Sequence, residues 1–217
     1  MIRRVLQLLI GLFLFGIGIS FLLKSNLGAS PWDVLAQGIA RHIPYTFGTI
    51  SVLLGIVVLL FWFPLRQKPG IGTVFNALLV GPSADVGLAV LPETGVLWLR
   101  VLFIVIGTVL VGLATGLYIG SRFGPGPRDG LMTGLHRVTG QPIWMVRVGL
   151  ELTVLAIGWL LGGTVGLGTV VFAVFIGHAC EFFMKIFYIE LPSDSDSEDT
   201  AATEADRAPA RVLESLA

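Results

Sequence analysis

A repeat with a constant shift of 96 positions organises the chain, because residues 28–38, GASPWDVLAQG, return at 124–134 as GPGPRDGLMTG. Glycine, proline, aspartate, leucine and a second glycine occupy matching places in the two stretches. The same shift carries the glycines and small residues of 70–81 onto 166–177 without a gap. The sequence therefore predicts two units with the same elements in the same order, repeat 1 at about 4–91 and repeat 2 at about 97–187.

The composition places both repeats in a membrane. Hydrophobic residues make up 54% of the chain and charged residues 13%, whereas charged residues are about 25% of an average soluble domain. Each repeat contains three apolar segments of about 18 residues or more, long enough to cross a hydrocarbon core of about 30 Å as helices. The fold class is thus an all-α polytopic membrane protein of about six transmembrane helices in one transmembrane domain, 1–191. The predicted segments are 4–23, 47–65, 71–91, 97–119, 143–161 and 167–187.

Three stretches need separate interpretation. Glycine, proline and aspartate interrupt the third segment at 81–85, so a kinked or broken helix is predicted there. The N-terminal run after Arg4 is longer than a signal-peptide core and recurs after Arg100, so it is predicted to stay as a helix. Residues 192–217 are acidic and contain too few apolar side chains to bury, which predicts a disordered cytoplasmic tail.

Lysine and arginine in the loops predict the orientation, since these residues gather on the cytoplasmic side. An N-terminus in the cytoplasm puts more of them inside than outside. The inner set is Arg3, Arg4, Arg66, Lys68, Arg122, Arg128, Arg137 and Lys185, and the outer set is Lys24, Arg41 and Arg100. Three spans per repeat then turn the second repeat upside down, an inverted-topology repeat with both termini cytoplasmic. If the Pro/Asp loops also spanned, the repeats would be parallel, but these loops are short and polar.

The repeated loop carries helix-start signals. Ser30 precedes a proline and Asp33 follows three residues later, as at a capped N-terminus whose dipole favours a carboxylate. The stretch 126–129 repeats these signals more weakly. A half helix is predicted after each proline, ending near Arg41 or Arg137, and it either lies in the membrane interface or dips into the protein as a re-entrant element.

Two interpretations of these loops stay open. In the functional one, Trp32, Asp33, Arg128 and Asp129 line a central cavity, where the helix N-termini and Arg128 can meet an anionic group of a substrate. In the other, the two aspartates only start helices and brace neighbouring loops. Trp32 and Arg128 stand at matching positions, which suits an outer interface for tryptophan and a cytoplasmic side for arginine.

Ionisable residues inside predicted spans form a second group of candidates, because such groups are costly in hydrocarbon and face the bundle interior. Asp85 matches Glu181 under the repeat, and Glu151 and His178 complete the group. One interpretation pairs Glu181 or Glu151 with Arg147 or His178 to hold helices together. The other is proton or cation coupling by an acid whose pKa burial raises. No metal site is predicted, since further His or Cys ligands are missing.

Several classes of function are not expected. The chain has no GxSxG, no HExxH and a single cysteine, so neither an enzyme, a cofactor nor an intrachain disulfide is predicted. Net charge is zero, and no basic patch indicates a nucleic acid. Glycines in the first span of each repeat, at 11, 16, 18, 107, 112 and 116, predict close helix packing with the lipid bilayer around it.

The most specific motifs are SPWDVL at 30–35, GPRDGLMTGL at 126–135 and GLGT at 166–169. Together they resemble the bacterial YczE-like membrane proteins, distantly akin to the YitT group, over residues 4–187. The resemblance implies the bacterial inner membrane and transfers no catalytic residue.

The leading hypothesis is a transporter or permease for a small solute, an anionic one among the options, with a cavity lined by the two Pro/Asp loops. The alternative is a non-transporting membrane scaffold or regulatory partner of another protein. Small inverted-repeat proteins often dimerise around a pathway, which suggests a homodimer by analogy.

Overall fold

The computed structural model describes residues 1–188, and within them the chain forms eight α-helices and no strand. The helices are α1 (Ile2–Lys24), α2 (Pro31–Ala40), α3 (Phe47–Trp62), α4 (Ile71–Val90), α5 (Leu97–Gly120), α6 (Pro127–Thr139), α7 (Ile143–Leu160) and α8 (Leu167–Phe187). Each predicted span corresponds to one helix, and the two short helices α2 and α6 begin at the repeated prolines as predicted. The predicted tail, 192–217, lies outside the described residues.

Five of these helices are long and apolar enough to cross a membrane: α1, α4, α5, α7 and α8. Helix α3 is apolar but has only 16 residues, about 24 Å at 1.5 Å per residue. It ends three residues before the predicted boundary, where the chain turns and Arg66 takes a φ of 51°. Gln7 Nε2 near the start of α1 donates to Phe187 O at the end of α8, 2.8 Å away. The start of α1 and the end of α8 therefore lie on one side of the molecule.

Helix α4 runs unbroken through Pro82, so of the two predicted forms, a kinked or a broken helix, the broken one is not found. A proline inside a helix deprives the preceding turn of a hydrogen-bond donor. The donor missing at Pro82 would bond Leu78 O, and the side chain of the next residue bonds the adjacent carbonyl, with Ser83 Oγ donating to Leu79 O at 2.8 Å. The neighbouring Gly16 of α1 also packs tightly here, since a Cβ on it would lie 2.5 Å from Ser83 Cβ.

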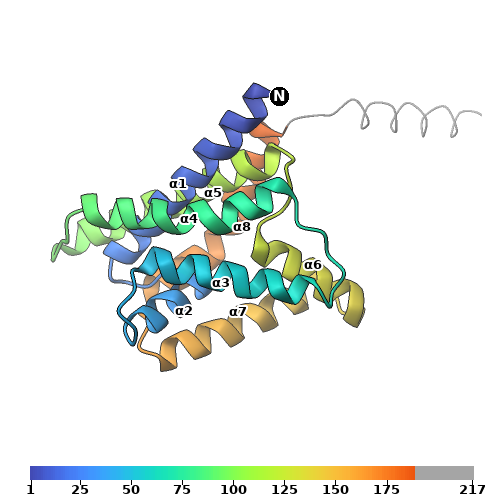
Figure 1. The fold of residues 1–217 in the computed structure, drawn as a ribbon. Coiled ribbons are helices and arrows are strands. Elements are labelled where there is room, and N and C mark those ends of the chain that lie inside the picture. The colour runs from blue at the N-terminus through green and yellow to red at the C-terminus, as the bar shows by residue number, and fades with distance from the viewer. Residues whose placement is uncertain (189–217) are drawn as a thin grey trace, which may run out of the picture.

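The helices form two layers (Figure 1). In one layer α4, α1, α5 and α8 lie side by side in that order, with α1 and α5 in the middle. In the other, α2, α7, α6 and α3 pack in a ring, each against the next. Leu12, Leu22 and Val34 are completely buried in the core where the layers meet.

Helices α1 and α5, the first spans of the two halves, are antiparallel. A Cβ on Gly11 would lie 2.9 Å from Leu117 Cβ, whereas one on Gly18 would lie 2.8 Å from Val111 Cγ2. The predicted use of these glycines for close helix packing is therefore confirmed.

Matching hydrogen bonds tie the two halves together at both ends of this helix pair. Arg4 Nε donates to Ser121 O at 2.9 Å, and Arg100 Nε donates to Ser25 O at 2.6 Å. The second nitrogen of each guanidinium reaches the next carbonyl, 3.1 Å from Arg4 and 2.6 Å from Arg100. Each arginine thus caps the C-terminal end of the other half's first span, where the helix dipole favours a cation.

The loops are exchanged between the halves in the same way. Gly168 N at the start of α8 donates to Leu27 O at 2.7 Å, and Gly72 N at the start of α4 donates to Phe123 O at 2.9 Å. Helix α2 packs against α7, and α6 packs against α3. Each half therefore holds the loop and short helix of the other.

One pair of helices departs from this correspondence. Helix α3 packs along α4, whereas their counterparts α7 and α8 hardly touch. Helices α7 and α8 are also the least buried of the five candidate spans.

Candidate functional site

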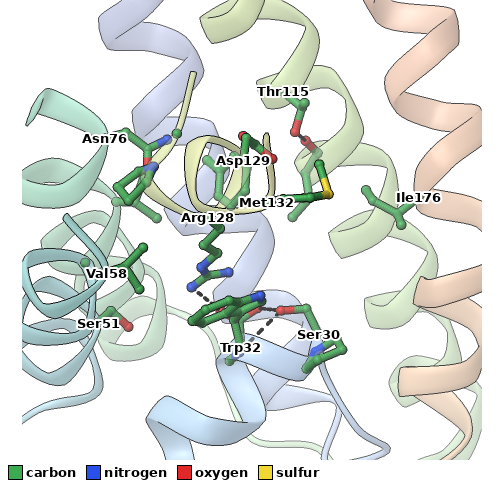
Figure 2. A pocket seen from close by; sticks show the side chains of 18 of the residues that line it. Ser30, Trp32, Ser51, Val58, Asn76, Thr115, Arg128, Asp129, Met132 and Ile176 are labelled. Carbon is green, nitrogen blue, oxygen red and sulfur yellow. Dashed lines mark hydrogen bonds and ion pairs between the residues drawn. The ribbon is translucent and has the colours of Figure 1, made fainter. Parts of the chain in front are cut away.

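A cavity of about 300 Å³ lies between the two layers, and all eight helices contribute to its wall. Figure 2 shows side chains from both Pro/Asp loops pointing into it. The polar lining residues are Ser30, Trp32, Asp33, Ser51, Asn76, Thr115, Tyr118, Arg128, Asp129, Arg147, Glu151 and Cys180.

The start of α2 is a capped helix N-terminus, as the sequence predicts. Ser30 takes an extended conformation and its Oγ accepts from Asp33 N at 3.3 Å. The same hydroxyl donates to Asp33 Oδ2 at 2.5 Å. The preceding loop turns at Gly28, whose φ of 112° suits only glycine, and Gly124 repeats this at 119°. The carboxylate of the helix's own first turn therefore occupies the place where an outside anion would bind.

Arg128 joins the two loops across the cavity. Its guanidinium carbon lies 5.3 Å from the centre of the Trp32 ring, and its Nη2 lies 3.5 Å from Asp33 Oδ1. Figure 2 shows the side chain reaching from α6 toward Trp32 on α2. Arg128 and Trp32 are the matching positions of the repeat, so a residue of one loop stacks on its own counterpart in the other.

Asp33 is 2% exposed, more deeply buried than its counterpart Asp129. Burial raises the pKa of the Asp33 carboxyl above its ordinary value, and the charge of Arg128 and the Ser30 hydroxyl lower the pKa in part. The two effects oppose each other at one carboxylate, which couples its charge to the position of Arg128.

Asp129 has a different neighbour. Tyr118 Oη of α5 donates to Asp129 Oδ2 at 2.7 Å. The start of α6 is held from the opposite side by α3, because Trp62 Nε1 donates to Pro127 O at 3.0 Å. The two aspartates of the repeat thus lie at one cavity but make unlike contacts.

Helix α7 adds a second ion pair to the wall. Arg147 Nε lies 3.0 Å from Glu151 Oε1, one turn further along the helix. The lining then carries the three carboxylates of Asp33, Asp129 and Glu151 and the two guanidiniums of Arg128 and Arg147. Both guanidiniums are paired with a carboxylate. Because one carboxylate is left over, the wall has a small excess of negative charge.

Five predicted site residues therefore line the cavity: Trp32, Asp33, Arg128, Asp129 and Glu151. Glu151 does pair with Arg147, but both residues belong to α7, so this pair does not hold two helices together as the first interpretation predicts. Whether these residues bind a substrate stays a prediction.

The other three ionisable candidates lie elsewhere. Asp85 accepts from Thr46 Oγ1 at 2.5 Å and from Gly48 N at 2.8 Å, and so caps the start of α3. Its counterpart Glu181 is exposed and binds Lys185, 2.8 Å away on the next turn. The expected equivalence of Asp85 and Glu181 is thus not found. The reason is that α3 lies beside α4, whereas no helix within residues 1–188 lies at the same place on α8.

His178 is exposed on α8, and its Nδ1 lies 3.3 Å from Val174 O. Among residues 1–188, no group of three or more His, Cys, Asp and Glu side chains comes close enough to hold a metal ion.

Sequence reasoning singled out neither Tyr118 nor Ser51 as part of the wall. Tyr118 lies within an apolar span, and its polar tip, one turn before the second loop, was the available signal. Ser51 gave no such signal, yet its Oγ is buried at the cavity without a hydrogen-bond partner in the described part of the chain.

Comparison with known proteins follows the same boundaries. Residues 2–185 match the model of a family of unknown function, DUF6198. The chain is 41% identical over 179 residues to an uncharacterised protein of Haemophilus influenzae, covering 82% of each chain. It is 32% identical over 197 residues to the uncharacterised membrane protein YczE of Bacillus subtilis, covering 90% of this chain and 91% of that one. No solved structure matches the chain. These matches confirm the YczE-like resemblance.

Proposed function

Because this chain belongs to the DUF6198 family, to which no function is assigned, we propose from its geometry that it is a permease for a small polar solute. The observation that carries the proposal is the cavity between the layers, where two repeated half helices bring ionised side chains together inside a membrane protein. Charged groups are costly in such a place and are kept where they serve a pathway or a relay.

The charge of the wall favours a solute with a cationic or neutral polar group over an anion. The N-terminus of α2 is already occupied by its own Asp33 and Ser30, and Arg128 is engaged by Asp33 and Trp32. Asp129 and the unpartnered Ser51 hydroxyl remain as acceptors toward the cavity. A solute ammonium group would compete with Arg128 for Asp33, which gives binding a direct means of moving the loop.

The antiparallel packing of α1 and α5 and the exchanged loop contacts support an inverted repeat, with α2 and α6 as re-entrant half helices. The start of α1 lies beside the end of α8. This supports a protein of the bacterial inner membrane with both termini on the cytoplasmic side. The role proposed is passage without chemical change of the solute.

Uptake by purified full-length protein in liposomes tests the proposal. A panel of radiolabelled small cations, zwitterions and anions is offered with and without a pH gradient. We expect uptake of a cationic or zwitterionic member and a loss of at least about tenfold in Asp129→Asn and Glu151→Gln. Glu93→Gln, at an exposed surface pair with Lys24, is the matched control and should leave uptake unchanged. Lack of uptake across the whole panel contradicts the proposal.

The second candidate is the non-transporting scaffold. The full pairing of Arg128 and Arg147 favours it, because satisfied ion pairs can simply brace loops. Cysteines at Trp32 and Arg128, in a Cys180→Ser background, separate the two functions. Labelling from both sides that changes with solute or pH supports a permease, and a fixed pattern supports a scaffold.

A further inference from the structure

The outward surface of α8 can be compared with the matching surface of α4, which packs against another helix. Ala77, Gly81 and Asp85 follow one another at every fourth position of α4 and meet α3. A Cβ on Gly81 would lie 2.3 Å from Gly48 O, and one on Gly55 would lie 3.3 Å from Ala77 Cβ. This stripe of small residues is therefore a helix-binding surface in the first half of the chain.

The same stripe recurs on α8 as Ala173, Gly177 and Glu181, and all three residues are exposed. A Cβ on Gly177 would meet no atom within 4 Å. We call Ala173, Gly177 and Glu181 the α8 stripe.

The sequence of α7 explains why α7 does not cover the α8 stripe. Trp144 stands at the position of Gly48, and Glu151 stands at the position of Gly55. An indole and a carboxylate replace the two glycines that let α3 approach α4. Glu151 is instead turned to the cavity by its pair with Arg147. The vacancy on α8 is thus encoded in the chain.

Charge excludes lipid as the natural cover for this surface. Glu181 is 65% exposed within a candidate membrane span, and His178 is exposed near the middle of the same span. Ionisable groups in a span face protein or water because acyl chains cannot solvate them. Glu181 has a base one turn before it in His178 and one turn after it in Lys185. Two parallel copies of this segment are therefore complementary to each other in charge.

We propose that the α8 stripe binds the α8 stripe of a second molecule of this protein, so that the two α8 helices cross at Gly177. Such a contact joins two molecules inserted in the same direction, as a two-fold axis along the membrane normal requires. Small residues allow the close approach, and each Glu181 reaches the bases of the partner molecule.

The contact also bears on the cavity. Phe172, Ile176, Cys180 and Met184 of α8 line the cavity and stand one position before or three after the members of the stripe. Helices α7 and α8 both bound the cavity while hardly touching each other. A second molecule on the α8 stripe covers this weakly closed wall. The inference does not depend on transport, since it concerns only the helix surface.

The oligomeric mass of the full-length protein in nanodiscs and mild detergent, measured over a range of concentrations, tests the contact. We expect a dimer whose dissociation constant rises at least about tenfold in Gly177→Leu. Gly149→Leu is the matched control, because Gly149 on α7 is also exposed with no atom within 4 Å of its Cβ position. It should leave the dissociation constant within about twofold. A native protein that stays monomeric, with or without bound lipid, overturns the proposal, and so does an equal effect of both leucines.

Disulfide cross-linking in membranes decides the matter even if Gly177→Leu fails to fold. In a Cys180→Ser background, Gly177→Cys should form a cross-linked dimer on mild oxidation. Phe175→Cys lies on the far side of the same helix and should not. Equal cross-linking at both positions overturns the proposal. Glu181→Lys should weaken the dimer, and adding Lys185→Glu to it should restore the dimer. If the second substitution does not restore it, the proposed contact between Glu181 and the bases of the second molecule is wrong.

Discussion

Arg4 in the first half of the chain and Arg100 in the second cap the opposite half's first span with two hydrogen bonds each. Gly48 and its counterpart Trp144, by contrast, share neither size nor surroundings. Each arginine at the junction belongs to one half and bonds the other half. Residues at the outer edge serve one half only. The contacts at the junction therefore match between the halves, whereas the outer edges differ, one being an internal interface and the other an open surface.

The largest expected difference concerns the two matching glycines of the stripes. Gly81→Ala places a Cβ 2.3 Å from a backbone oxygen of α3, so we expect a loss of about 2 to 3 kcal/mol in the free energy of unfolding. Gly177→Ala meets open space and gains helix propensity, so its stability should stay level or rise slightly. Thermal unfolding in detergent at monomeric concentrations measures both. Equal losses would mean that α7 covers α8 after all.

The two aspartates of the repeated loop should differ next. Asp33→Asn removes the anionic partner of Arg128 at a site that is almost fully buried, and we expect it to cost about 2 kcal/mol. Asp129→Asn keeps an oxygen that accepts from Tyr118, so about 1 kcal/mol is expected. Thermal unfolding again gives the comparison. A larger loss of stability for Asp129→Asn would contradict the conclusion that Asp33 is the more strongly held of the two aspartates.

The matched arginines should behave alike. Arg4→Lys and Arg100→Lys each replace a two-pronged donor by a single ammonium, and we expect each to cost about 1 to 2 kcal/mol. Arg4 also stacks 4.5 Å from the centre of the Phe123 ring, so its loss should be the larger by roughly 0.5 kcal/mol. Denaturation midpoints of the two variants check this. If one of the two substitutions leaves the denaturation midpoint unchanged, the two arginines do not have matching roles in the two halves.

The smallest difference concerns the acids that end the stripes. Asp85→Ala removes the acceptor at the start of α3 and should cost about 1 kcal/mol, as loss of a helix cap does. Glu181→Ala should leave the unfolding of the monomer unchanged, because its ion pair with Lys185 lies exposed at the surface. Asp85→Asn, which keeps an acceptor oxygen, is the control for the cap.

Much of this architecture follows from sequence because its causes are local. Apolar length determines the spans, and Ser30 before proline determines the start of α2 through its own side chain. Arg128 and Asp33 were identified as cavity residues from the repeat, but their ion pair joins positions 95 residues apart and depends on how the layers meet. The cap formed by Asp85 depends on a helix 37 residues before it. Trp144 stands where the first repeat has Gly48, and this difference in the sequence was enough to predict different surroundings for Asp85 and Glu181.

The exchanged loops also set an order of events during synthesis. Leu27 O accepts from Gly168 N, and α2 packs against α7. Gly168 and α7 both belong to the second half, so these contacts can form only after that half has been synthesised. Until then the polar backbone of the first loop lacks its partner, and such an incomplete state is exposed to proteases and chaperones. A first half expressed by itself should therefore be degraded, while two halves produced from separate genes should protect one another. The packing of the first half is in this sense completed late in synthesis, when α7 and α8 have been made.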